Sequence, residues 1–110
     1  MESALQEREV VLPEARILGV RVHRVRMVEA LQRIEQLIHQ REPSLVITAD
    51  ANAILIALED AEFRQLLETA SLITADGAGL IWAGKRLGQP FPERVSGVDL
   101  VEHLTRLSHE

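Results

Sequence analysis

The sequence has 110 residues, of which 46% are apolar, 26% are charged and 3% are aromatic; its formal net charge is −5 and it has no cysteine. These values favour one compact domain with an aliphatic core, and they exclude disulfides and thiolate metal sites. The negative charge argues against a general nucleic-acid-binding protein, and no apolar run approaches the roughly 20 residues of a membrane span.

The first half of the chain predicts a leader, a strand region, a helix and a second strand. Residues 1–13 are expected to be a mobile leader without a signal peptide, and residues 14–110 to form the domain. Alternation over residues 16–25 predicts one strand, or a tight pair that turns at Gly19. Apolar residues spaced three to four apart from Met27 onward predict an amphipathic helix that ends before Pro43. Residues 44–48 then predict a short buried strand.

The second half continues this alternation of helices and strands. Residues 54–67 predict a helix with a break near Asp60, residues 71–74 a strand, residues 78–87 a third helix, and residues 98–107 a fourth. This order predicts an α/β fold with a parallel or mostly parallel sheet flanked by helices. We expect a Rossmann-like three-layer arrangement with a short N-terminal strand or hairpin.

The candidate for the chemistry is Asp76, which follows an apolar strand and precedes Gly77 and Gly79. It can act as a general base at a strand end, where the glycine amides and a helix N-terminus face an anionic ligand. It can also be a helix cap beside a tight turn, and the tetrapeptide alone favours this second interpretation.

Other polar residues lie at equivalent places along the chain. Thr48, Asp50 and Asn52 end the preceding strand. If the two strands are neighbours, Thr48 and Asp76 should open into the same cleft. Capping is the alternative, and it is the favoured role for at least one of the three. Arg94 can bind a diphosphate or a sugar, or it can pair with Glu93 or Asp99. Asp99 itself is expected to cap the last helix.

The histidines, Trp82 and the Lys85-Arg86 pair give no candidate functional site. The histidines are scattered and give no metal-binding pair, and Gly-x-Ser-x-Gly is absent, so neither a metal site nor a serine triad is expected. Trp82 is expected to lie in the core, and Lys85 and Arg86 on a solvated helix face.

Several motifs, in the right order and spacing, resemble the WecG/TagA/CpsF family of bacterial glycosyltransferases. The family pattern is a strand ending Thr-x-Asn, a helix with Asp-x-Glu-Phe-Arg, a strand ending Asp-Gly, an apolar-Trp-Ala helix, and the loop Pro-x-Glu-Arg-Val-x-Gly-x-Asp-Leu. This chain has Thr48-Ala49-Asp50, Asp60-Ala61-Glu62-Phe63-Arg64, Asp76-Gly77-Ala78-Gly79, Ile81-Trp82-Ala83 and Pro92-Glu93-Arg94-Val95-Ser96-Gly97-Val98-Asp99-Leu100. One departure is Asp50, which stands where the family often has Asn.

The resemblance implies an inverting enzyme without metal or other cofactor. Such an enzyme transfers an N-acetylmannosamine-type sugar from a UDP-sugar to a polyprenyl-diphosphate-linked acceptor, in the synthesis of teichoic acid, enterobacterial common antigen or exopolysaccharide. The family's catalytic aspartate falls on Asp76, its supporting threonine on Thr48 and its loop arginine on Arg94. The candidate substrate-binding residues are Asp50, Asn52, Gly77, Gly79, Arg94 and Asp99.

Family members are roughly twice as long as this chain, so the resemblance also implies the N-terminal portion of a longer domain. We expect the remaining part to supply much of the nucleotide-sugar site and to contact the inner face of the cell membrane from the cytoplasm. The isolated chain should then bind donor weakly or not at all, and an exposed apolar face should favour a homo-oligomer. A non-catalytic nucleotide- or sugar-binding module, or a truncated fragment, is the alternative.

Overall fold

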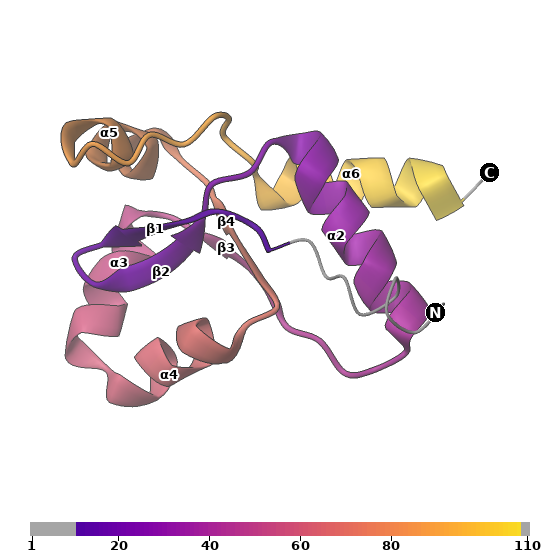
Figure 1. The fold of residues 1–110 in the computed structure, drawn as a ribbon, viewed down its shortest axis with the longest axis horizontal. Coiled ribbons are helices and arrows are strands. Elements are labelled where there is room, and N and C mark those ends of the chain that lie inside the picture. The colour runs from indigo at the N-terminus through magenta and orange to yellow at the C-terminus, as the bar shows by residue number, and fades with distance from the viewer. Residues whose placement is uncertain (1–10, 109–110) are drawn as a thin grey trace.

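The computed structural model describes residues 11–108, so residues 1–10 of the expected leader lie outside the described part. The strands are β1 (Glu14–Ile17), β2 (Val20–His23), β3 (Val46–Ala49) and β4 (Leu72–Ala75). The helices are α2 (Met27–Gln40), α3 (Ala51–Glu59), α4 (Ala61–Thr69), α5 (Ala78–Arg86) and α6 (Gly97–Ser108). None of the described helices is both long and apolar enough to cross a membrane. This is the predicted α/β fold, and Figure 1 shows its arrangement.

The N-terminal strand region is a tight antiparallel hairpin. β1 pairs with β2 in a register that joins Ala15 to Val22 and Ile17 to Val20, so these four buried side chains share one face. The turn places Gly19 at a φ of 82°, in the left-handed region that glycine adopts without a steric penalty. The structure therefore settles the choice between one strand and a pair in favour of the pair.

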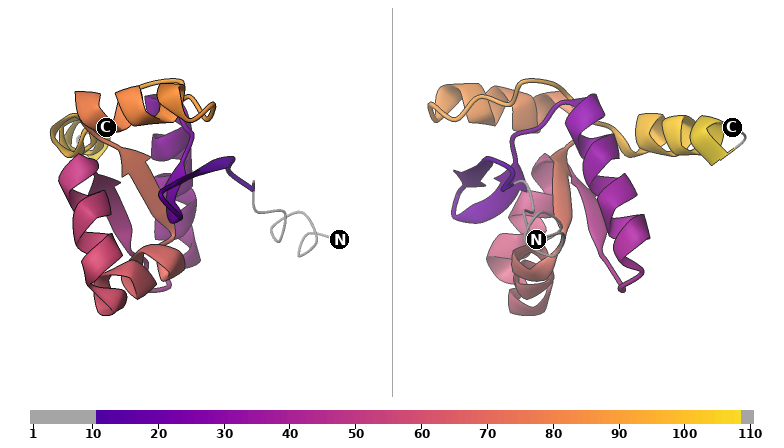
Figure 2. Two further views of the ribbon diagram at one scale, coloured as in Figure 1. Left: turned by 90° about the vertical axis from the view of Figure 1, so that its left-hand side faces the viewer. Right: turned by 45° about the vertical axis from the view of Figure 1, so that its right-hand side comes forward.

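A parallel pair of strands separates two apolar cores. β3 pairs with β4 so that Thr48 lies opposite Thr74 and Ala49 opposite Ala75. Ile73 and Ala75 belong to one core with the hairpin, α3, α4 and α5, whereas Leu72 belongs to a second core with α2 and α6. Figure 2 shows the helices on either side of this parallel pair. The flanked arrangement confirms the predicted fold class.

Side-chain caps define where α3 and α4 begin. Asp50 accepts a hydrogen bond of 2.8 Å from the amide of Ala53, and Asp60 accepts one of 3.1 Å from the amide of Phe63. Each bond satisfies one of the amides that a helix N-terminus leaves without an internal partner. Asp60 also separates α3 from α4, as the predicted break near this residue requires.

Arg21 joins the hairpin to the C-terminal end of α4. Its guanidinium donates to the carbonyl oxygens of Leu67, Glu68 and Ala70 at 3.3, 3.4 and 3.0 Å, and its Nε donates to Glu14 at 2.7 Å. The last carbonyls of a helix have no partner within the helix, and a positive charge there is favourable. The hairpin therefore completes the end of α4 as well as contributing to the core.

Candidate functional site

Asp76 lies immediately after β4, with its carboxylate held on both oxygens. Its amide donates to the carbonyl of Ala49 at 2.8 Å, which continues the strand pairing by one residue. Oδ1 accepts from Nε and Nη2 of Arg94 at 3.4 and 3.3 Å, and Oδ2 accepts from the amide of Gly97 at 3.4 Å. The side chain keeps 27% of its surface exposed.

This geometry contradicts the interpretation of Asp76 as the cap of α5, the helix that follows it. The N-cap residue of α5 is Gly77, and no side chain caps this end of the helix. The carboxylate binds instead to Arg94 in the loop after α5 and to the amide of Gly97, the first residue of α6. The local tetrapeptide pattern suggested a cap because it contains no information about that loop.

The loop before α6 brings Arg94 to Asp76. Val95 donates its amide to the carbonyl of Ala75 at 2.8 Å, and the buried hydroxyl of Thr74 donates to the carbonyl of Val95 at 3.1 Å. Both bonds hold the loop against the end of β4. Arg94 therefore pairs with neither of the sequence neighbours considered for it, Glu93 and Asp99.

Glu93 and Asp99 make contacts elsewhere. The Glu93 carboxylate accepts a hydrogen bond from the amide of Met27 at the start of α2. The hydroxyl of Ser96 accepts the amide of Asp99 at 3.2 Å, so Ser96 provides the side-chain cap that was expected from Asp99. Asp99 lies exposed in the first turn of α6.

Gly97 connects Asp76 with Thr48. A Cβ atom added to Gly97 would lie 3.2 Å from Oγ1 of Thr48, which is tighter than an ordinary contact. Glycine therefore lets the backbone pass close to Thr48 while its amide donates to Asp76. The structure thus brings the exposed Thr48 and Asp76 to one place at the carboxyl ends of β3 and β4, where ligands bind in parallel α/β sheets.

The N-termini of α3 and α5 lie side by side beyond these strand ends. A Cβ atom on Gly77 would lie 3.7 Å from Cβ of Asp50, and one on Gly79 would lie 3.3 Å from Cβ of Ala51. Gly77 has a φ of 107°, which a larger residue rarely adopts. Asp50 is the cap of α3, the structural alternative considered for it, and Asn52 is exposed in the first turn of the same helix.

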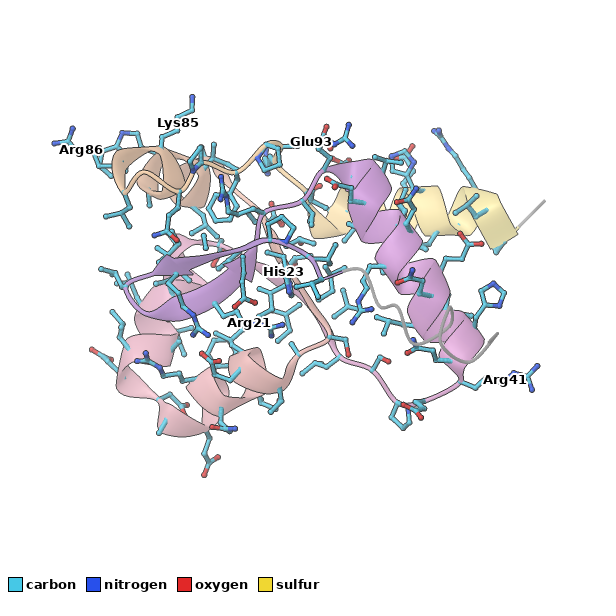
Figure 3. The ribbon with its side chains drawn as sticks, in the orientation of Figure 1. Arg21, His23, Arg41, Lys85, Arg86 and Glu93 are labelled. Carbon is cyan, nitrogen blue, oxygen red and sulfur yellow. The ribbon has the colours of Figure 1, made fainter. Side chains whose placement is uncertain are left out.

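The helix α5 differs from expectation at Trp82. This side chain is 64% exposed, so the prediction of a core position is wrong. Lys85 and Arg86 are exposed as expected, and Figure 3 shows both pointing outward from α5. Within residues 11–108, no group of three His, Asp or Glu side chains is placed to hold a metal ion.

Sequence reasoning missed the role of His23, which is 4% exposed between the hairpin and β4. Its Nδ1 accepts the amide of Ile73 at 2.9 Å, and its Nε2 lies 3.2 Å from Nη2 of Arg21. Burial, followed by the neighbouring Arg21 charge, lowers the pKa of His23 to about 4. Figure 3 shows Arg21 and His23 close together on β2. This neutral imidazole joins the two sheets of the domain.

Comparison with known proteins agrees with these motifs. The model of the Glycosyl transferase WecG/TagA/CpsF family matches residues 15–110. The chain is 27% identical over 95 residues to proteins of Staphylococcus aureus strains NCTC 8325 / PS 47 and COL, both named N-acetylglucosaminyldiphosphoundecaprenol N-acetyl-beta-D-mannosaminyltransferase. The match covers 84% of this chain and 37% of each relative. By the extent of the family match, the chain belongs to the WecG/TagA/CpsF family of glycosyl transferases.

Proposed function

We propose that this chain carries the catalytic base of an inverting, UDP-sugar-dependent hexosyltransferase. The transferred sugar is of the N-acetylmannosamine type, and the acceptor is a sugar linked to a polyprenyl diphosphate. The product enters teichoic acid or another cell-surface polysaccharide. The family membership and the names of the Staphylococcus aureus relatives support this proposal.

The observation that carries the proposal is the position of Asp76. A partly exposed carboxylate extends from the end of a buried strand, close to Thr48 on the neighbouring parallel strand and to Arg94 on the following loop. A base for sugar transfer must lie on a rigid element and within hydrogen-bond reach of the acceptor hydroxyl. The backbone bond to Ala49 fixes Asp76 to the rigid sheet, and the exposed part of its carboxylate can accept a bond from an acceptor hydroxyl.

The proposed reaction is a single displacement. Asp76 accepts the proton of the acceptor hydroxyl while the hydroxyl oxygen attacks the anomeric carbon of the donor sugar. UDP lies on the opposite face of that carbon. The bond between the carbon and the UDP oxygen breaks, and UDP leaves with the electron pair. The configuration at the anomeric carbon is inverted, and Thr48 positions the sugar beside the base.

Arg94 has a second role in this proposal. Its guanidinium is 60% exposed, and its two bonds to Oδ1 of Asp76 are longer than 3.2 Å, so a diphosphate that offers two negative groups can compete for it. Movement of Arg94 to the diphosphate would free one oxygen of Asp76 to accept the proton. The uncapped N-terminus of α5, with the amides around Gly77 and Gly79, can assist because helix N-termini favour anions.

Asp50, Asn52 and Asp99 complete the proposed substrate-binding set. Asp50 contributes through the position of the α3 N-terminus, since its carboxylate already caps that helix. Asn52 and Asp99 offer exposed polar groups on the first turns of α3 and α6.

The chain spans 37% of the length of the relatives that it matches. We therefore propose that residues 14–110 act as the N-terminal portion of a longer family domain, in which a later segment completes the nucleotide-sugar site and contacts the inner face of the cell membrane. We also propose that the chain forms a homo-oligomer. Donor binding without transfer would favour the alternative of a non-catalytic module.

A chimaera tests the catalytic proposal. Residues 15–110 of this chain replace the matched 95-residue segment of the Staphylococcus aureus transferase, and transfer from UDP-N-acetylmannosamine to the undecaprenyl-linked acceptor is measured. We expect Asp76→Asn to lower kcat by roughly 10²–10⁴-fold with an unchanged melting temperature.

Asp60→Asn is the matched control, because it makes the same chemical change at a helix cap that asparagine also satisfies. It should leave both kcat and the melting temperature unchanged. If Asp76→Asn retains full transfer in an active chimaera, Asp76 is not the base. If Asp76→Asn lowers the melting temperature instead of kcat, its role is structural.

A further inference from the structure

We infer that Thr74 is a positioning residue for Arg94, because it fixes the backbone from which the Arg94 guanidinium reaches the diphosphate of the donor. This inference rests on the proposed function, in which Arg94 leaves Asp76 to bind that diphosphate. Thr74 lies on β4, two residues before Asp76, and it is fully buried. It therefore acts through the loop before α6 and touches no substrate itself.

Thr74 and Asp76 lie on the same side of the parallel pair of strands, because side chains two residues apart on a strand share a face. Leu72 belongs to this face as well, and it packs in one core with Val95 and Leu100. The loop before α6 thus crosses the face of the sheet on which Thr74 lies. One strand directs both the candidate base and a buried hydroxyl at this loop.

The hydroxyl of Thr74 is bonded to the loop and not to the sheet. It donates to the carbonyl oxygen of Val95 at 3.1 Å. Burying a hydroxyl without such a partner costs free energy, so the bond is needed once threonine occupies this position. Valine has nearly the same shape without the hydroxyl, so the packing of this apolar face alone does not require threonine.

Val95 is held to β4 through both of its backbone polar groups. Its amide donates to the carbonyl of Ala75 at 2.8 Å, and its carbonyl accepts the hydroxyl of Thr74. Arg94 directly precedes Val95, and the amide of Gly97 lies two residues further on, 3.4 Å from Oδ2 of Asp76. The Thr74 bond therefore fixes the backbone between the two groups that hold the Asp76 carboxylate.

The side chain of Arg94 can exchange partners while its backbone stays in place. It is 60% exposed, and its bonds to Oδ1 of Asp76, at 3.3 and 3.4 Å, are long for a charged pair. On a fixed backbone the guanidinium turns to a diphosphate by side-chain rotation, so little ordering of the loop opposes binding. Loosening the loop should weaken the diphosphate contact and leave the uridine contact unchanged.

Inhibition of the transferase chimaera by UDP and by UMP tests this inference, because the two nucleotides differ by one phosphate group. We expect UDP to inhibit at a lower concentration than UMP, and Arg94→Gln to narrow this difference. Thr74→Val should narrow it by roughly 3–10-fold, the equivalent of one hydrogen bond, with an unchanged inhibition constant for UMP. Thr74→Ser keeps the hydroxyl and should restore the difference. Thr105→Val is the matched control, because it removes a hydroxyl that bonds within α6.

The variants separate a failure of this inference from a failure of the proposed function. If Arg94→Gln narrows the difference between UDP and UMP but Thr74→Val does not, Arg94 binds the diphosphate without help from Thr74, and the inference is wrong. If Arg94→Gln has no effect, the diphosphate role of Arg94 fails and the inference fails with it. If Thr74→Val weakens UDP and UMP equally, Thr74 serves only the stability of the fold, and the inference is again wrong.

Hydrogen exchange on the unaltered chimaera gives a test that does not depend on whether Thr74→Val folds. The amide of Val95 should be protected equally with and without UDP, because the loop is fixed to β4 before the ligand binds. An amide of Val95 that exchanges freely until UDP is added would show that the ligand orders the loop. That result would overturn the inference.

Discussion

The buried His23 predicts that the domain loses stability between pH 7 and pH 5. The imidazole is 4% exposed, and its Nδ1 lone pair accepts the amide of Ile73, so the folded protein favours the neutral form. The folded pKa is about 4, compared with an ordinary value of 6.5. The unfolded chain therefore takes up a proton over a pH range in which the folded chain does not.

The sign and size of the effect follow from this difference. Above pH 6.5 the imidazole is neutral in both states, and its full contribution to stability is present. As the pH falls below 6.5, protonation stabilises the unfolded chain, and the loss is complete once the pH passes below about 4. The total loss is about 3 kcal/mol, of which about 2 kcal/mol falls between pH 7 and pH 5.

Glu29 and Glu68 also have lowered pKa values, through hydrogen bonds with Arg26 and Arg16 respectively. Their contributions are present above an unfolded pKa of 4.5 and fall away below it. Measurements between pH 7 and pH 5 therefore keep the contribution of these two carboxyls small.

Urea denaturation at several pH values measures the effect. The unaltered chain should lose about 2 kcal/mol of unfolding free energy between pH 7 and pH 5. His23→Asn should be less stable at pH 7 but nearly independent of pH over this range, because an amide oxygen can accept from Ile73 without titrating. His39→Asn is the matched control, since His39 is exposed on α2 and its replacement should preserve the slope of the parent. An unaltered chain with no slope, or a slope that survives in His23→Asn, would refute the reasoning.

Three further predictions test the packing, a helix cap and the ligand. Gly84→Ala should lower unfolding free energy by about 1–3 kcal/mol in urea denaturation, because the new Cβ would lie 2.7 Å from the Phe91 ring and 2.8 Å from the Gln89 carbonyl; unchanged stability would contradict this packing. Ser96→Ala should cost about 1 kcal/mol in the same assay through loss of the α6 cap, whereas Asp99→Ala should cost less; the reverse order would make Asp99 the cap. Titration calorimetry with a UDP-sugar should show weak or no binding to the 110-residue chain, and tight binding would show that a later segment is not needed for the donor.

The order of helices and strands could be predicted because it depends on local patterns. Apolar spacing gave the helix from Met27, and Gly19 allowed a hairpin turn that the structure contains. Asp60 marked the break between two helices, since an N-cap is a local feature. The proximity of Thr48 to the end of β4 followed from one further step, that consecutive parallel strands lie side by side.

The partner of Arg94 could not be predicted in the same way. Asp76 is distant in sequence, and the two meet because Val95 pairs with Ala75 after an intervening helix and loop. The closer acids Glu93 and Asp99 were the natural candidates from spacing alone. The exposure of Trp82 also lay beyond local patterns, because an apolar helix does not reveal which of its faces is covered.

The hydrogen bonds from Arg21 to the end of α4 limit how far the N-terminal side of this protein can be shortened. A version that started at α2 would lose β1 and β2 together with the apolar face of the hairpin. It would also lose Arg21, which donates to three carbonyl oxygens at the end of α4. These carbonyls lie just before β4, the strand that Asp76 follows. Removing the chain up to α2 would thus loosen the segment that leads into β4, without removing any residue around Asp76.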